Sequence, residues 1–322
     1  MDERRRRNIE IVAVVAVVIL AAFYARAGYI PTWSERHLAE AAEKWDLPVA
    51  NVGPWFSAWT LGDGQATAII ASDPLGYEFG EVLRDPGYRF ARAGYSWLTW
   101  AVIGGQHHLI PYGMAIVGGL ALVGVLITAL VLQNRLGTQA WLLLLNPALY
   151  IGFAGDTAEP LAILFLTLAM ASNSHWAGVA LGVTRPDYLI AAFGRWRVLA
   201  AGLTASVVMA AYGIWRFGFD TLLPKVDLLA LPFAGYLDQP SLAGWLLATA
   251  ALGTLVVGIR NRDVVWVLAA LFVVCFAPIV TVEPVNAWRA AGMLPVLWAF
   301  GPRPEQAQRS AASDMSPLAA SA

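Results

Sequence analysis

The side chains in this sequence that could do chemistry are carboxylates and arginines, and they lie near the ends of long apolar segments. Asp63 stands in the stretch Gly62 to Ala71, and Arg89 and Arg92 follow it. Further ionisable residues of interest are Asp73, Asp156, Glu159, Arg185, Asp187, Glu283 and Arg289. A carboxylate can accept the proton of an attacking hydroxyl group, and arginines can hold the charge that develops on a departing phosphate. The set is therefore suited to transfer of a sugar from a lipid-linked phosphate to a hydroxyl group.

The composition indicates a membrane protein. Charged residues make up 13% of the chain and hydrophobic residues 58%, whereas a soluble domain carries about 25% charged residues. The apolar residues occur in uninterrupted runs, as lipid-facing helices require. The formal net charge of -1 gives no electrostatic case for binding nucleic acid. The single cysteine, Cys275, lies in an apolar run, which excludes an internal disulfide and a cysteine metal site.

Apolar segments predict about eight full transmembrane helices, so we expect an all-α, polytopic fold with additional short or broken helices. The segments are Ile9 to Ala27, Ile110 to Leu132, Trp141 to Phe153, Leu161 to Ala171, Val198 to Trp215, Trp245 to Ile259, Val264 to Val280 and Ala290 to Phe300. We interpret the first as an uncleaved helix rather than a signal peptide. Gly94 to Gly105 is about half a span and predicts an interfacial helix. Ala177 to Gly194 contains Pro186 and predicts two short helices.

Basic residues give the predicted orientation. Arg4 to Arg7 precede the first segment and place the N-terminus in the cytoplasm. Arg135 and Arg260 also conform to the positive-inside rule, whereas Arg216 is an exception. We expect one transmembrane domain over residues 1–301, with residues 29–94 as its first extracytoplasmic loop and 302–322 as a disordered cytoplasmic tail. Under this topology the acids and arginines gather at the outer face, where ionisable residues at membrane depth indicate function.

The first outer loop carries two further expectations. Ser34 to Trp45 predicts an N-capped amphipathic turn or two before the acid-bearing stretch. Gly62 to Ala71 is interpreted as part of a polar loop, in which Asp63 and Asp73 could approach each other. These two acids do not make a convincing metal-ligand set, and we expect neither a metal nor a cofactor beyond a lipid-linked sugar donor.

The order of these features resembles the GT-C superfamily of multispanning glycosyltransferases. Within it, the chain is most similar to the mannosyltransferases that use dolichyl- or polyprenyl-phosphate mannose. These include the second mannosyltransferase of GPI-anchor synthesis and its bacterial relatives. That family shows an aspartate in the first outer loop, an aromatic start to a short helix, a proline followed by Tyr-Thr-Glu, a Thr-Arg-Pro, and a late arginine before a proline. The similar segments here are Gly62 to Ala71, Arg92 to Leu98, Asn146-Pro147 with Asp156 to Pro160, Thr184-Arg185-Pro186, and Arg289 to Pro295. Gln65 and Ala66 stand where the family has histidine or an aromatic residue.

The resemblance implies roles for particular residues. Asp63 would be the catalytic base, and Arg185 with Arg92 or Arg289 would hold the lipid phosphate. Glu159 would orient the substrate or pair with an arginine. The substrate-binding candidates in the matching segments also include Gln65, Asp156 and Tyr95. The implied partners are a polyprenyl-phosphate sugar donor, a glycan, lipid or protein acceptor, and the bilayer of a bacterial plasma membrane.

Two alternatives remain open at this stage. A transporter or lipid flippase for an anionic substrate would use the broken helices around Arg185 and Pro186, although such proteins usually show breaks at corresponding positions of paired repeats. A non-catalytic GT-C-like subunit of a larger membrane complex would bind the lipid phosphosugar without transferring it. The departures at Gln65 and Ala66 are compatible with this second alternative.

Overall fold

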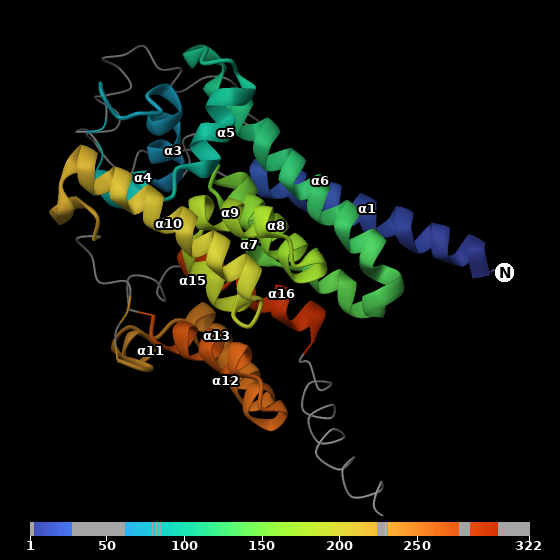
Figure 1. Ribbon diagram of the computed structural model, residues 1–322. Coiled ribbons are helices and arrows are strands. Elements are labelled where there is room, and N and C mark those ends of the chain that lie inside the picture. Colours follow the sequence, from blue (N-terminus) through green and yellow to red (C-terminus); the bar gives the residue numbers. More distant parts are fainter. Residues whose placement is uncertain are drawn as a thin grey trace, which may run out of the picture.

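The described part of the chain is helical. The computed structural model describes residues 3–27, 62–78, 80, 83, 85–223, 229, 231–276 and 284–301 (Figure 1). Within these ranges no β-strand forms, and the one isolated bridge joins Leu229 to Phe276. The expected amphipathic segment Ser34 to Trp45, the acid Glu283 and the tail from Pro302 lie outside the described residues.

The helices follow one another with short connections. Their bounds are α1 Glu3–Ala27, α3 Gly62–Ser72, α4 Pro86–Phe90, α5 Gly94–Val102, η2 His107–Leu109, α6 Ile110–Leu136, η3 Gly137–Leu143, α7 Pro147–Ala154, α8 Glu159–Ser172, α9 His175–Thr184, η4 Pro186–Ala192, α10 Trp196–Phe217, η5 Phe219–Thr221, α11 Ala234–Asp238, α12 Leu242–Asn261, α13 Val264–Val274, α15 Pro284–Ala290 and α16 Met293–Phe300.

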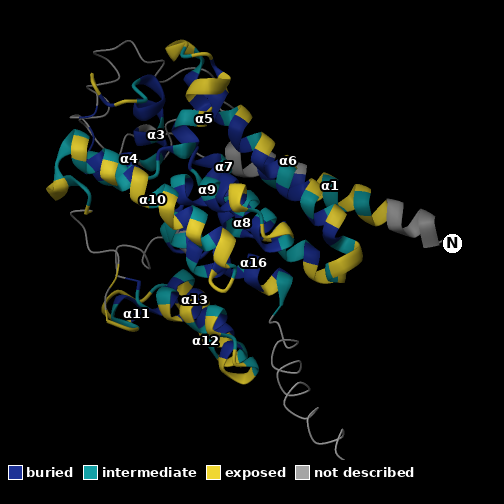
Figure 2. Ribbon diagram, viewed as in Figure 1, coloured by how far each residue is buried: buried dark blue, intermediate teal, exposed yellow. Residues whose placement is uncertain are grey.

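Three helical stretches are long and apolar enough to cross a membrane. They are His107–Leu143, which contains α6, and the helices α10 and α12. Shorter apolar helices occur at Ile9–Ala22, Glu159–Ser172 and Val264–Val274. Large apolar side chains on α6, α10 and α12 are exposed, as Figure 2 shows along the outer helices, and this is the pattern that lipid-facing surfaces require. The protein is therefore suited to membrane association, while the full set of eight spans stays a prediction.

The core of the bundle is formed by short helices that the long ones surround. α7, α8, η4 and α16 carry buried side chains such as Leu149, Leu166 and Val296, and dark blue is prominent around α7 and α8 near the centre of Figure 2. α9 packs closely on α10 because glycines meet there: a Cβ at Gly178 would lie 2.2 Å from the carbonyl oxygen of Val198. α12 and α13 pack against each other at the lower edge of Figure 1, and their buried side chains belong to the same core.

Two segments that the sequence predicts as single crossings are interrupted. Trp141 to Phe153 is divided between η3 and α7, because the side chain of Asn146 accepts a hydrogen bond from the amide of Ala148 and caps a new helix that begins at Pro147. Ala290 to Phe300 is divided between the end of α15 and α16. The expected break at Pro186 is confirmed, since α9 ends at Thr184 and η4 begins at Pro186.

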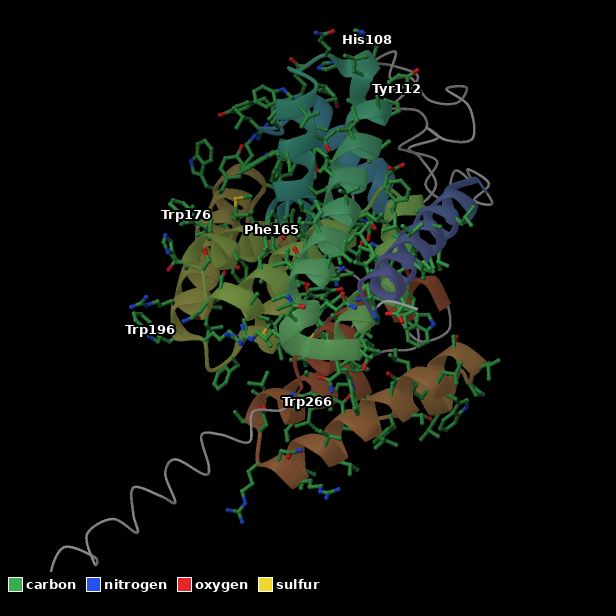
Figure 3. All side chains as sticks on the ribbon, turned by 90° about the vertical axis from the view of Figure 1, so that its right-hand side faces the viewer. His108, Tyr112, Phe165, Trp176, Trp196 and Trp266 are labelled. Atoms are coloured by element: carbon green, nitrogen blue, oxygen red, sulfur yellow. The ribbon has the colours of Figure 1, made fainter. Side chains whose placement is uncertain are left out.

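Two exposed tryptophans lie on one side of the molecule. Trp176 near the start of α9 and Trp196 at the start of α10 are each 71% exposed, and both project from the same side of the molecule in Figure 3. Arg197 lies with its guanidinium 6.0 Å from the ring of Trp196. Tryptophan and arginine together are typical of the level at which a helix leaves the hydrocarbon layer.

Candidate active site

Asp63 lies in the first turn of α3, so this part of the predicted outer loop is a helix. The segment is helical because its alanines and isoleucines are buried on two sides. One set of these side chains packs with α5 and α6, and another packs with α4 and α10. The N-terminal end of a helix also stabilises a carboxylate through the helix dipole. This packing holds Asp63 at the edge of the core.

The turn after α3 is fixed by hydrogen bonds from neighbouring helices. The indole of Trp97, the hydroxyl of Tyr212 and the guanidinium of Arg216 donate to the carbonyls of residues 74, 75 and 76 at 2.9, 2.7 and 2.7 Å. Arg216 also lies 4.9 Å from the centre of the Tyr77 ring. Arg216, the exception to the positive-inside rule, is therefore accounted for by local bonding. The same contacts hold the far end of the helix that carries Asp63.

The carboxylate of Asp63 is bound by two arginines from different helices. Its Oδ1 atom accepts a hydrogen bond from Arg89 of α4, and its Oδ2 atom lies 2.6 Å from a terminal nitrogen of Arg289 of α15. The side chain of Asp63 is 30% exposed, whereas that of Arg289 is 9% exposed. Each oxygen of the acid is thus matched to its own guanidinium group.

A second, fully buried carboxylate lies beside the first. Glu159, at the start of α8, is 1% exposed and is paired with Arg185. Its Oε1 atom also lies 3.0 Å from Arg289, and its Oε2 atom accepts a hydrogen bond from the hydroxyl of Thr157. Arg289 therefore bridges Asp63 and Glu159. This bridge agrees with the expectation that Glu159 pairs with an arginine.

Arg185 occupies the break between α9 and η4. Its backbone leaves the helical region there, with φ -145° and ψ 77°, because Pro186 follows. The guanidinium then forms a bidentate pair with Asp187, at 2.9 Å from Nε to Oδ1 and 2.6 Å from the terminal nitrogen to Oδ2. Burial raises the pKa of Asp187, but the adjacent Arg185 outweighs this effect and holds the pKa below its ordinary value.

Most of the predicted site residues line one cavity. Asp63, Arg92, Tyr95, Glu159, Arg185 and Arg289 all contribute to its wall, together with Arg89, Thr157 and Thr184. Arg92 lies with its guanidinium 4.2 Å from the centre of the Tyr88 ring. The hydroxyl of Tyr95 donates to the carbonyl of Met114 at 2.8 Å, so this group is engaged in packing α5 against α6.

Two predicted residues are not part of the described wall. Asp156 is buried, with a left-handed backbone at φ 53°, and it precedes the wall residue Thr157 without belonging to the wall. The side chain of Gln65 lies outside the described residues. Six of the eight predicted site residues therefore lie together in the wall of this cavity.

Asp63 and Asp73 do not approach each other. They stand at the two ends of α3, which at about 1.5 Å of rise per residue separates them by roughly 15 Å. Asp73 instead accepts a hydrogen bond from the amide of Glu78 at 2.7 Å. Among the described residues, no group of three or more His, Cys, Asp and Glu side chains is arranged to hold a metal ion.

The cavity carries an excess of positive charge. Four arginines and two carboxylates line it. Burial raises the pKa of Asp63, but Arg89, Arg289 and Arg92 outweigh burial and hold the pKa of this carboxyl well below its ordinary value. In the arrangement seen here Asp63 is therefore a weak base.

Arg89 is the site residue that sequence reasoning did not single out. It belongs to the ionisable residues named from the sequence, whereas the resemblance implies Arg92 as a phosphate ligand. The two arginines stand only three positions apart, Arg89 in α4 and Arg92 just after it. That spacing is a signal that both could reach the same site. It does not reveal which of them meets Asp63.

The cavity is small for a ligand pocket. Its volume is about 40 Å³, whereas pockets for small molecules are about 300–1,000 Å³. Asp63, Arg89, Glu159, Arg185 and Arg289, which form the ion pairs, all belong to its wall.

Comparison of the chain with protein-family models, with curated proteins and with solved structures found no match.

Proposed function

We propose that this protein is an integral membrane glycosyltransferase of the GT-C type. In this proposal it transfers a sugar, mannose by preference, from a polyprenyl-phosphate donor to a glycan, lipid or protein acceptor outside the cytoplasm. The observation that carries the proposal is the convergence of Asp63 with Arg89, Arg185 and Arg289, from four separate helical regions, on one cavity. An acid beside several arginines is what phosphate departure with proton removal requires.

The proposed reaction is a single displacement with inversion. The acceptor hydroxyl oxygen forms a bond to the anomeric carbon of the sugar, and the bond from that carbon to the phosphate oxygen breaks. The bonding electrons leave with the polyprenyl phosphate, whose added negative charge the arginines stabilise. The proton of the acceptor hydroxyl passes to the carboxylate of Asp63 and then to solvent.

An apolar groove supports a lipid-linked donor. Its volume is about 330 Å³, and it is lined by apolar side chains of η3, α7, α12, α15 and α16. Trp288 and Ala291 belong to its wall, while Arg289 between them contributes to the charged cavity. A ligand with a phosphate head and a hydrocarbon tail matches this succession of charged and apolar surfaces.

We further propose a bacterial plasma membrane location, about eight spans, and cytoplasmic N- and C-termini. The exposed Trp176 and Trp196 near Arg197 support a cytoplasmic interface at the start of α9 and α10. The active site would then face the opposite side. An accompanying membrane protein is compatible with this arrangement, and it would present the acceptor.

The test combines lipid identification with a transfer assay. Mass spectrometry of lipid that copurifies with the protein is expected to detect a polyprenyl phosphate or its glycoside. Proteoliposomes supplied with radiolabelled polyprenyl-phosphate mannose should then transfer label to an acceptor. Asp63→Asn should abolish transfer while leaving the protein folded and inserted, whereas Asp238→Asn, the same change at an exposed acid on α11, should leave transfer intact.

Three results would contradict the proposal. Undiminished transfer by Asp63→Asn would remove this acid from the mechanism. Uptake of an anionic solute without sugar transfer would instead indicate a transporter or flippase. Binding of the lipid phosphosugar without product, with every acceptor tested, would indicate a non-catalytic subunit.

A further inference from the structure

We propose that Arg89 and Arg289 form the phosphate-binding pair of this site, and that the carboxylate of Asp63 occupies this pair until the phosphate group of a ligand displaces it. The inference rests on the proposed function only for the lipid that carries the phosphate. It adds Arg89 as a ligand-binding residue, and it assigns Asp63 a second role as an internal competitor for its own substrate.

The geometry of the pair is the first argument. Arg89 contacts one oxygen of Asp63, and Arg289 contacts the other at 2.6 Å. Two guanidinium groups that converge on separate oxygens of one anion are arranged as phosphate recognition requires. A carboxylate and a phosphate would compete for the same donors, so both cannot be fully bound by this pair at once.

An unused donor is the second argument. The Nε atom of Arg289 is buried and has no hydrogen-bond partner among the described residues. Buried donors in native structures are nearly always paired, so an exception needs an explanation. A phosphate offers more acceptor oxygens than a carboxylate, and it could bind the Nε atom as well as the terminal nitrogen that Asp63 now holds. A ligand phosphate would therefore satisfy a donor that Asp63 leaves unmatched.

The small size of the cavity is the third argument. At about 40 Å³ it admits no phosphate ester while Asp63 stays between the arginines. Of the two acids that Arg289 contacts, Asp63 is 30% exposed and Glu159 is 1% exposed. Asp63 is thus the one of the two that can leave its arginines with the smaller desolvation change, because part of its surface already meets solvent.

Displacement gives the site an order of events. While Asp63 is held by Arg89 and Arg289, its affinity for a proton is low. Once the phosphate takes both arginines, the freed carboxylate lies beside a new negative charge, and both changes raise its proton affinity. The base would therefore become competent only after the donor has bound. In this scheme the donor precedes the acceptor.

The experiment measures binding, so it does not depend on sugar transfer. Isothermal titration calorimetry of the purified full-length protein in detergent would compare farnesyl phosphate, inorganic phosphate and farnesol. Asp63→Asn is expected to tighten binding of farnesyl phosphate by about tenfold or more, because the variant no longer supplies the competing charge. Asp238→Asn serves as the matched control and should bind like the unmodified protein.

A folded Asp63→Asn variant with unchanged or weaker phosphate affinity would overturn the inference, because Asp63 would then be a fixed counter-ion. Should this variant fail to fold, Arg89→Gln and Arg92→Gln decide the question. The inference requires that Arg89→Gln weaken farnesyl phosphate binding more than Arg92→Gln does, and an equal or smaller effect overturns it.

The three ligands separate the sources of the phosphate. Tighter binding of farnesyl phosphate than of inorganic phosphate supports a lipid carrier. Equal affinities for farnesyl phosphate and inorganic phosphate would support Arg89 and Arg289 as the phosphate-binding pair but reject a lipid carrier. If uncharged farnesol binds as tightly as farnesyl phosphate, the proposed phosphate-binding pair is overturned. The inference and the proposed function can also fail separately. If Asp63→Asn binds farnesyl phosphate more tightly but the unmodified protein transfers no sugar, this inference is supported and the proposed transferase is rejected.

Discussion

The carboxylate of Asp63 and the guanidinium of Arg289 lie 2.6 Å apart although 226 positions separate them in the chain. The contact joins α3 to α15. Arg289 also lies 3.0 Å from Glu159, so one buried cation serves two acids from different helices. The site is therefore a product of tertiary packing, and its central element is Arg289.

Removing this cation should destabilise the protein strongly. Arg289→Gln leaves Glu159, which is 1% exposed, with one fewer compensating charge, and breaking such a buried pair costs about 3–5 kcal/mol. We expect a clear fall in the midpoint of thermal unfolding, measured by intrinsic tryptophan fluorescence of the protein in nanodiscs. Arg289→Gln combined with Asp63→Asn should regain part of the loss, because the double variant removes an acid together with its cation. A double variant no more stable than Arg289→Gln alone would argue against direct coupling of the two residues.

Much of the helical pattern could be predicted from the sequence, because long apolar runs and prolines report directly on helices and their breaks. The break at Pro186 is an example, and α10 and α12 lie within a few residues of their predicted bounds. The interruption at Asn146 was missed although a capping side chain followed by proline is a recognised start signal. α3 was missed for another reason: its glycines and acid favour a loop locally, and burial on two sides decides otherwise.

The candidate site could be predicted in its members but not in its pairings. Charged residues within apolar sequence are few, so Asp63, Arg185 and Arg289 could be singled out by type and position. Which arginine meets which acid depends on helix packing across the whole chain, and nothing local in the sequence gives it. For that reason the sequence names Arg89 as an ionisable residue of interest but does not pair it with Asp63. The matching segment makes Tyr95 a substrate-binding candidate, but its hydroxyl donates to the carbonyl of Met114, and nothing in the sequence indicates this partner.

Tyr188 is expected to position the two buried arginines. Its hydroxyl donates to the carbonyl of Arg289 at 2.9 Å, and its ring lies 5.0 Å from the guanidinium carbon of Arg185. Tyr188→Phe should cost about 1 kcal/mol of stability and also weaken farnesyl phosphate binding. Tyr150→Phe is the control, because its hydroxyl makes a similar bond to the carbonyl of Leu144 away from the cavity wall. Calorimetry that finds equal binding losses in both variants would reduce Tyr188 to a purely structural role.

The ionisation of Asp63 predicts a pH dependence of stability. Its pKa in the folded protein is lowered, so its contribution is fully present above the unfolded value of about 3.9 and is lost as the pH falls through the folded value. Unfolding midpoints of the unmodified protein and of Asp63→Asn should therefore differ by a constant amount between about pH 7 and pH 5. The difference should shrink only below about pH 4. If it already vanishes between pH 7 and pH 5, the pKa of Asp63 is raised rather than lowered.

The close packing of α9 on α10 should be needed to place Arg185, which follows directly after α9. A Cβ at Gly178 would meet the carbonyl oxygen of Val198 at 2.2 Å, so Gly178→Ala must push the two helices apart. Such overpacking costs about 1–3 kcal/mol, and we expect a lower unfolding midpoint and weaker binding of farnesyl phosphate.

Gly253→Ala on α12 is the matched control: no atom lies within 4 Å of the added Cβ, and alanine favours a helix over glycine by about 1 kcal/mol. It should leave binding unchanged and stability equal or slightly higher. Normal phosphate affinity in Gly178→Ala would mean that the position of Arg185 is set by Pro186 and its ion pairs alone, without help from the α9–α10 contact.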